Sequence, residues 1–169
     1  SAAAFAHTEM QAKYDARNPA ALKQLVAGKT KLVAFPKPVL DAAFKEAMQS
    51  HREEIARIGA SRAKPTFANT IAALEKSGRQ LSRVAAVFFN LTAADTNEAL
   101  QKIERDMAPK LSAHESRIML DAGLFARVDD LYQRRDTLGL DPEELRVLEL
   151  QHLWLVRAGA KLNAKDKKR

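Results

Sequence analysis

The chain has 169 residues, of which 46% are hydrophobic, so it is long and apolar enough to bury a core and does not belong to the disordered class. Cysteine is absent, which excludes disulfide bonds and thiolate chemistry, and charged residues interrupt every apolar run well before the roughly 18 residues of a membrane span. The net charge of +7 comes from residues 1–37 and 161–169, each +4, around a body of −1, so we expect no nucleic-acid partner.

Helix-favouring residues dominate the whole chain, and no stretch alternates apolar and polar residues as a strand would. The predicted fold class is therefore all-α, an antiparallel helical bundle or array. Residues 1–38 are expected to be a variable segment with helices over 3–16 and 19–27, the second ending before Gly28. The prolines within 36–38 exclude helix and make a connector.

Residues 39–169 form the second predicted region, which opens with a helix over 39–58. Its apolar side chains recur every three or four residues, the spacing of one helix face, and Gly59 ends it. This stripe consists of Leu40, Phe44, Met48, Ile55 and Ile58.

Two shorter helices are expected next. Thr66 or Asn69 caps the first, and Gly78 allows the chain to break or turn after it. The second covers residues 79–93. Its apolar side chains are Leu81, Val84, Val87, Phe88 and Leu91.

The aromatic residues on this part of the chain allow two interpretations. Phe88 and Phe89 are adjacent, so on a helix they point about 100° apart and cannot share one narrow stripe. The simpler interpretation is a helix buried on more than one side. The alternative is that Phe89 or Trp154 faces a substrate channel or another part of the same protein.

Acidic caps mark the remaining helices. Asp95, with an acid three residues later, begins a helix that reaches residue 119 and is kinked by Pro109. Asp121 begins a helix that reaches residue 137, and Asp141, followed by proline and two acids, begins one that reaches residue 157. Asn163 caps a further helix that the chain leaves incomplete, which suggests truncation within its last helix.

The histidines do not form a zinc-protease motif. There are four of them: His7, His51, His114 and His152. The motif needs two histidines four residues apart on a helix, with a glutamate after the first. His114-Glu115 begins this pattern, but Ile118 stands where the second histidine is needed, so His114 is interpreted as a helix-surface residue. His51 and His152 are interpreted as solvent-facing or partly buried, with a polar contact in a larger assembly as the alternative for His152.

Other catalytic patterns are missing as well. No nucleophile stands on a recognisable sharp, glycine-flanked turn, and the six glycines are scattered rather than gathered in a phosphate loop. The carboxylate pairs Glu53-Glu54 and Asp129-Asp130 point in different directions on their helices, as solvated side chains do. We therefore assign no catalytic, cofactor-binding or metal-binding residue to this chain.

Several segments, in order along the chain, resemble the thimet-oligopeptidase family of zinc peptidases, and within it the bacterial peptidyl-dipeptidases. The longest reads PTFANTIAALEKSGRQLSRVAAVFFNLTAADTNEALQKIE, residues 65–104. The others are residues 44–58, 107–118, 124–149 and 157–162. Residues 1 to about 40 do not match the family pattern, and family members are several times longer than this chain.

The resemblance implies an almost entirely helical enzyme with a deep channel, a zinc ion held by a downstream motif, and release of C-terminal dipeptides from short peptides. This chain would be its N-terminal, non-catalytic helical part, a wall of the channel. Zinc would be a cofactor of the parent enzyme and would not be bound by this chain. The partner would be the C-terminal remainder of the same peptidase.

Three hypotheses follow. The first is an inactive fragment of such a peptidase, which predicts that apolar surface around Phe88 and Trp154 is exposed or covered by a second copy. The second is a stand-alone helical binding or scaffold module, whose basic tails would contact an acidic partner. The third is an independently active enzyme. The lack of cysteine and of a signal peptide favours a cytoplasmic location, with the periplasm as the alternative.

Overall fold

The computed structural model describes residues 24, 27–28, 37–94 and 98–162. The chain divides into two units, Ser1–Pro36 and Lys37–Arg169, and every helix described below belongs to the second. The connector predicted to reach residue 38 is wrong at its end, because a helix begins at Lys37 and holds Pro38 in its first turn, where proline is tolerated. The helix predicted over residues 3–16, most of that over 19–27, and the caps predicted at Asp95 and Asn163 lie outside the described residues.

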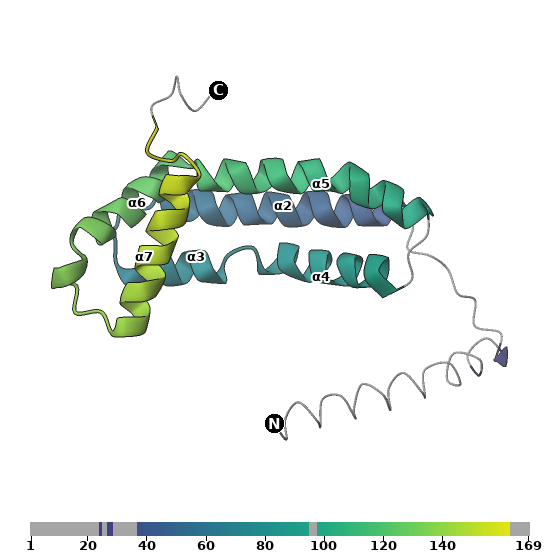
Figure 1. Ribbon diagram of the computed structural model, residues 1–169, viewed down its shortest axis with the longest axis horizontal. Helices are drawn as coiled ribbons and strands as arrows, with labels where there is room; N and C mark the ends of the chain where they lie inside the picture. The colour runs from purple at the N-terminus through teal and green to yellow at the C-terminus, as the bar shows by residue number, and fades with distance from the viewer. Residues whose placement is uncertain (1–23, 25–26, 29–36, 95–97, 163–169) are drawn as a thin grey trace. The chain divides into compact units, whose positions relative to one another are not determined.

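Five longer helices and three short helical elements make up the described part of Lys37–Arg169 (Figure 1). The longer helices are α2 (Lys37–Gly59), α4 (Arg79–Ala94), α5 (Glu98–Met119), α6 (Ala122–Gln133) and α7 (Pro142–Arg157). The shorter elements are a π-helical turn (Phe67–Ile71), α3 (Ala72–Lys76) and a 3₁₀ turn (Arg135–Thr137).

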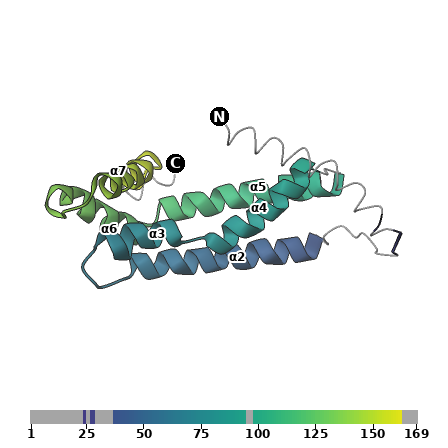
Figure 2. The same ribbon diagram turned by 90° about the horizontal axis from the view of Figure 1, so that it is seen from below.

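The helices run up and down beside one another. In Figures 1 and 2, α2 and α5 run in one direction and α3 and α4 run back in the other. Helix α2 contacts α4, α5 and α6, and α7 packs on α6 and on the π-helical turn. Helices α6 and α7 therefore cover one end of the group, and α2, α4 and α5 form the other.

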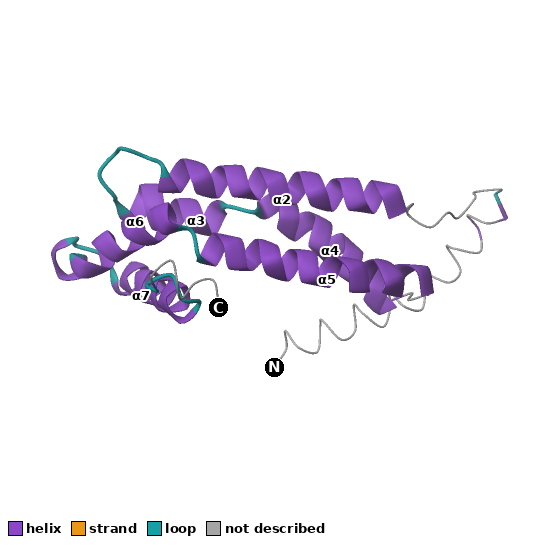
Figure 3. Ribbon diagram, turned by 90° about the horizontal axis from the view of Figure 1, so that it is seen from above, coloured by secondary structure: helices purple, strands orange, loops and turns teal. Residues whose placement is uncertain are grey.

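Every element in the described part of the chain is helical, as Figure 3 shows. The predicted all-α fold class is therefore confirmed. The helix containing Pro109 is continuous from Glu98 to Met119, and the kink expected at that proline stays a prediction.

Caps at three helix starts agree with the sequence. The Thr66 hydroxyl accepts from the Asn69 amide at 3.2 Å, and the Asn69 carboxamide oxygen accepts from the Thr66 amide at 2.9 Å, so both candidates act in one reciprocal box. Asp121 accepts from the Leu124 amide at 2.7 Å. Asp141 begins α7 with a second reciprocal box.

The helix that follows Asp121 is shorter than predicted. It ends at Gln133 rather than near residue 137, and the last part of the expected helix, Arg135–Thr137, is a 3₁₀ turn. The Arg135 guanidinium turns back to the carbonyl of Tyr132 at 2.9 Å and lies 4.5 Å from the centre of its ring, so it covers the end of α6.

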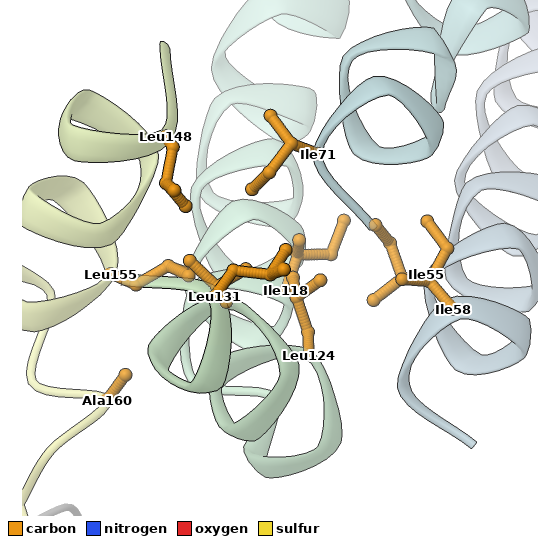
Figure 4. Close-up of a cluster of buried hydrophobic side chains, with 10 residues drawn as sticks. Ile55, Ile58, Ile71, Ile118, Leu124, Leu131, Leu148, Leu155 and Ala160 are labelled. Carbon is orange, nitrogen blue, oxygen red and sulfur yellow. The ribbon is translucent and has the colours of Figure 1, made fainter. Parts of the chain in front are cut away.

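The buried side chains form two clusters. The end cluster joins α2, the π-helical turn, α5, α6 and α7 (Figure 4). It consists of Ile55, Ile58, Ile71, Ile118, Leu124, Val128, Leu131, Leu148, Leu155 and Ala160. The bundle cluster joins α2, α4 and α5, and consists of Leu40, Phe44, Met48, Phe88, Leu100, Ile103 and Met107. The stripe predicted on residues 39–58 is buried throughout, as expected.

Helix α4 buries only part of its predicted apolar side. Phe88 is fully buried, with its ring edge-on to Phe44 at a centroid distance of 5.5 Å. Val87 and Leu91, predicted to share that side, are 55% and 37% exposed. Phe89 is 40% exposed. The interpretation of a helix buried on more than one side is therefore wrong for the described residues, because α4 packs on α2 and α5 and leaves Val87, Phe89 and Leu91 exposed.

Candidate functional site

A groove of about 450 Å³ lies among α2, α3, α4, α5 and α7. Its apolar lining comes from Leu74, Leu81, Ala85, Leu111, Ile118, Met119 and Trp154. Its polar lining comes from His51, Glu75, Ser77, Ser82, His114, Glu115 and Gln151. Apolar walls with a few polar groups are typical of surfaces that bind other molecules, so this groove is the candidate site.

A chain of hydrogen bonds runs along the polar side of this groove. His114 Nε2, on α5, lies 3.1 Å from His51 Nδ1, on α2. His51 Nε2 lies 3.2 Å from Ser77 Oγ, between α3 and α4, and the Ser77 hydroxyl donates to the Leu74 carbonyl at 2.6 Å. We call His114, His51 and Ser77 the histidine chain; it joins three separate elements.

His114 is not the surface residue that its sequence context suggested. It is 7% exposed and lies in line with apolar residues of α5. Met107, Leu111, His114 and Ile118 are spaced by four, three and four residues, which places His114 on the buried face. His51 and His152 are partly buried, in agreement with their interpretation.

The hydrogen bonds determine which ring nitrogens carry protons. Ser77 uses its single proton for the Leu74 carbonyl, so its oxygen must accept from His51 Nε2–H. His51 Nδ1 is then unprotonated and accepts from His114 Nε2–H. This leaves His114 Nδ1 unprotonated, and that atom is buried without a partner. We therefore assign both rings as neutral, with the proton on Nε2.

The surroundings of both rings favour this neutral form. Burial lowers the pKa of His114 to about 4, with smaller effects from His51, Arg52 and Arg117. Burial also lowers the pKa of His51, although the carboxylate of Glu54 acts in the opposite direction. The two effects agree with the tautomers, because a second proton on either ring would leave one N–H of the pair without an acceptor.

The order serine, histidine, histidine invites comparison with a nucleophile and its base. Base catalysis requires His51 Nε2 to accept the serine proton. Here that nitrogen donates, and the Ser77 proton is held by a backbone carbonyl. The assigned tautomers therefore do not activate Ser77, and the group acts as a structural link.

Gly78 lets the histidine chain form. Its φ of +68° is in the left-handed region, and a Cβ there would lie 2.8 Å from His51 Cε1. Its amide donates to Glu54 Oε2 at 2.7 Å. His51 and Glu54, one turn apart on α2, thus hold both sides of the α3–α4 junction, and a solvated role for Glu54 is ruled out.

Comparisons with known proteins show two relatives named as dipeptidyl carboxypeptidases. No family model matches it. Over 125 residues it is 49% identical to dipeptidyl carboxypeptidase of Escherichia coli strain K12, and the match covers 74% of this chain and 18% of that protein. Over 127 residues it is 46% identical to dipeptidyl carboxypeptidase of Salmonella typhimurium strain LT2, covering 75% and 19%.

This chain is similar to dipeptidyl carboxypeptidases. Identity of this size over more than 120 residues reflects common ancestry. The resemblance found in the helical segments of the sequence is therefore not a chance match. The chain spans about a fifth of the length of the curated relatives it matches.

Apolar surface is exposed on both α4 and α7. On α4 it comes from Val87, Phe89 and Leu91, and on α7 from Leu153 and Trp154, which are 39% and 48% exposed. The expectation of exposed apolar surface around Phe88 and Trp154 is thus confirmed, although Phe88 itself is buried. Trp154 also lines the groove.

Arg127 is a buried residue that the sequence analysis did not single out. It is 6% exposed, and its guanidinium donates to the carbonyls of Ser61 and Ala63 at 2.9 and 2.8 Å. It also donates to Asn69 Oδ1 at 2.8 Å and to Thr70 Oγ1 at 3.2 Å. It thereby fixes the loop between α2 and the π-helical turn. The signal was its position between Leu124 and Val128 on the apolar face of α6.

His152 makes a polar contact within this chain. Its Nε2 donates to Asp129 Oδ1 at 2.9 Å, and its ring stacks on Tyr132 with centroids 3.8 Å apart. Asp130, the neighbour of Asp129, pairs with Arg134 at 2.6 Å. The two acids point to different partners, as adjacent helix positions do.

Among the described residues, no three or more His, Cys, Asp or Glu side chains are grouped as metal ligands would be. His51 and His114 face each other, but their facing nitrogens are bonded to each other. Within the same part of the chain, no helix is both long and apolar enough to cross a membrane.

Proposed function

We propose that this chain is a non-catalytic helical part of a peptidase that releases dipeptides from the C-terminus of short peptides. The observation that supports it is the identity of 49% over 125 residues with a dipeptidyl carboxypeptidase. The match covers 18% of that protein, which leaves room for the catalytic machinery elsewhere.

Zinc is the cofactor that the resemblance implies for the parent enzyme. The described residues do not fit a zinc site, because they lack a group of three or more suitable ligands and the two neighbouring histidines use their facing nitrogens on each other. We therefore assign the proposed zinc to residues other than those described, and derive no catalytic step from this part of the chain.

The remainder of the same peptidase is the proposed partner of this chain. Exposed apolar residues on α4 and α7, among them Phe89 and Trp154, are the surfaces that the remainder would cover. In this arrangement the helices wall a channel and limit access to it, so their contribution to catalysis is steric.

The activity is tested with the complete gene product and an N-acetylated tetrapeptide, with mass spectrometry of the products. We expect release of the C-terminal dipeptide, its loss with a chelator and its recovery with zinc, whereas the 169-residue chain alone releases none. An open reading frame that stops after Arg169, or a complete product that releases no dipeptide, overturns the proposal.

The docking surface is tested by mixing the 169-residue chain with the separately produced remainder of the gene product. Phe89→Ser and Trp154→Ser should each weaken association at least tenfold, because burying the exposed half of a large aromatic side chain is worth about 2 kcal/mol. Asn90→Ser, an exposed polar position on α4, is the matched control and should leave association unchanged. Equal affinities for all three variants would remove these surfaces from the interface.

A further inference from the structure

The histidine chain forms a polar layer between the two apolar clusters. On α2, His51 stands between Met48 of the bundle cluster and Ile55 of the end cluster. On α5, His114 stands between Met107 and Ile118 in the same way. The rings lie 5.1 Å apart between centroids. The layer is therefore the point where α2, α5 and the α3–α4 junction are tied together by polar bonds.

The bonds of this layer are all satisfied best when both rings are neutral. A proton added to His51 Nδ1 would either meet the proton on His114 Nε2 or force that proton to His114 Nδ1. A proton added to His114 Nδ1 would enter a buried position that has no acceptor. Each of these changes removes a bond or leaves a buried N–H without an acceptor, so protonation destabilises the closed layer.

We propose that the histidine chain is a proton-controlled latch: uptake of a proton by His51 or His114 separates the α3–α4 junction from α2 and thereby opens the groove lined by Trp154. The junction is the less firmly anchored side, because α3 is a short helix with no buried residue and Gly78 separates it from α4. Helices α2 and α5 are each anchored in both clusters, so they hold their positions.

The charges around the two rings favour the closed state at neutral pH. Arg52 on α2 and Arg117 on α5 lower the pKa of His114, and burial, the main cause, brings it to about 4. Glu54 on α2 raises the pKa of His51, which burial lowers overall. Glu75 on α3 and Glu115 on α5 also line the groove.

Helices α4 and α7 contribute only uncharged residues to the lining, namely Leu81, Ser82, Ala85, Gln151 and Trp154. The open state, with its rings in water, has the ordinary histidine pKa of 6.5, whereas closed His114 has one of about 4. Between pH 6.5 and about pH 4, opening therefore takes up one proton. The equilibrium constant for opening then rises about tenfold for each pH unit of acidification.

The latch is tested by hydrogen exchange with mass spectrometry on peptides covering residues 74–85, in the complete gene product, from pH 7.5 to pH 4. Exchange rates are corrected for the intrinsic pH dependence of the amides. The key variant is His51→Gln with His114→Gln, since a glutamine amide can donate to Ser77 and accept from its neighbour without titrating. His152→Gln is the matched control, because it removes a partly buried histidine outside the layer.

Wild type and His152→Gln should lose protection of the junction about tenfold per pH unit below pH 6.5, while the double variant keeps it. Carboxylates also titrate in acid, but the double variant retains all of them, Glu54 included, so they cannot produce this difference. Unchanged protection in wild type down to pH 4, or an equal loss in the double variant, overturns the latch.

A second variant tests the proposal if the double variant does not fold. Ser77→Ala removes only the last link, so it should expose the junction already at pH 7.5 and flatten its pH dependence. Peptides from α6, distant from the layer, should keep wild-type protection in this variant. A Ser77→Ala protein with the wild-type pH profile would also refute the proposal.

Discussion

Replacing Gly78 by alanine tests whether the close approach of His51 matters as much as the backbone angle. Gly139 offers a matched control, because both glycines have a left-handed backbone, with φ of +68° and +64°. A Cβ on Gly139 would meet nothing within 4 Å, whereas one on Gly78 would lie 2.8 Å from the ring of His51. The two substitutions therefore share a backbone penalty and differ in the contact.

The expected magnitudes follow from this difference. Placing an alanine in the left-handed region costs about 1 kcal/mol once the loss of unfolded-state freedom is counted, and Gly139→Ala should show that value. Gly78→Ala also displaces His51, which makes hydrogen bonds to Ser77 and His114 worth about 1 kcal/mol each. The total for Gly78→Ala is then about 3 kcal/mol.

Urea unfolding of the 169-residue chain, followed by the fluorescence of its single tryptophan, measures both losses. In a His51→Ala background the excess of Gly78→Ala over Gly139→Ala should disappear, since there is no ring left to displace. Equal losses for the two glycine variants in the wild-type background, within about 0.5 kcal/mol, would refute the argument from the contact.

Three further predictions concern other parts of the chain. Phe88→Ala should cost about 3–5 kcal/mol in the same urea assay and Phe89→Ala less than about 1, because only Phe88 fills a core position; equal costs would contradict this. Acidification from pH 6.5 to pH 4 should lower the free energy of unfolding by up to about 3 kcal/mol, because unfolded His114 takes up a proton that the folded chain excludes; His114→Gln should reduce this slope. Arg127→Met should release the loop it binds and speed trypsin cleavage at Arg62, an exposed site, whereas Arg134→Met should do so less; identical cleavage rates would argue against the anchor.

The helices were predictable because local signals and packing agree in most of them. The stripe on residues 39–58 is buried, and the cap at Asp141 sits where its sequence places it. Arg135–Thr137 departs from the prediction because the helical pattern after Asp121 continues past the point where Arg135 folds back on the carbonyl of Tyr132. That contact forms because the chain turns back at the end of α6, and the spacing of apolar residues in the sequence does not encode this turn.

The candidate site was only partly visible in the sequence. His114 and Arg127 both occupy positions on an apolar face, at the three- and four-residue spacing of their buried neighbours, and this spacing could have marked them as buried. The pairing of His114 with His51 could not be found in this way, because the two residues are 63 positions apart and meet only through the packing of α5 on α2. Ser77 gives no local signal for its role either.

A buried pair of neutral histidines is a costly way to join two helices, and an apolar pair at these positions would merge the two clusters into one core. The polar layer instead fixes how α2 and α5 align, because the hydrogen bond between His51 and His114 is directional. The α3–α4 junction is joined to the same layer by the bond between His51 and Ser77. Its cost rises when a proton is available, since His114 Nδ1 is already buried without a partner. A layer of this kind makes one face of the groove sensitive to pH while the end cluster and the bundle cluster hold the remaining helices in place.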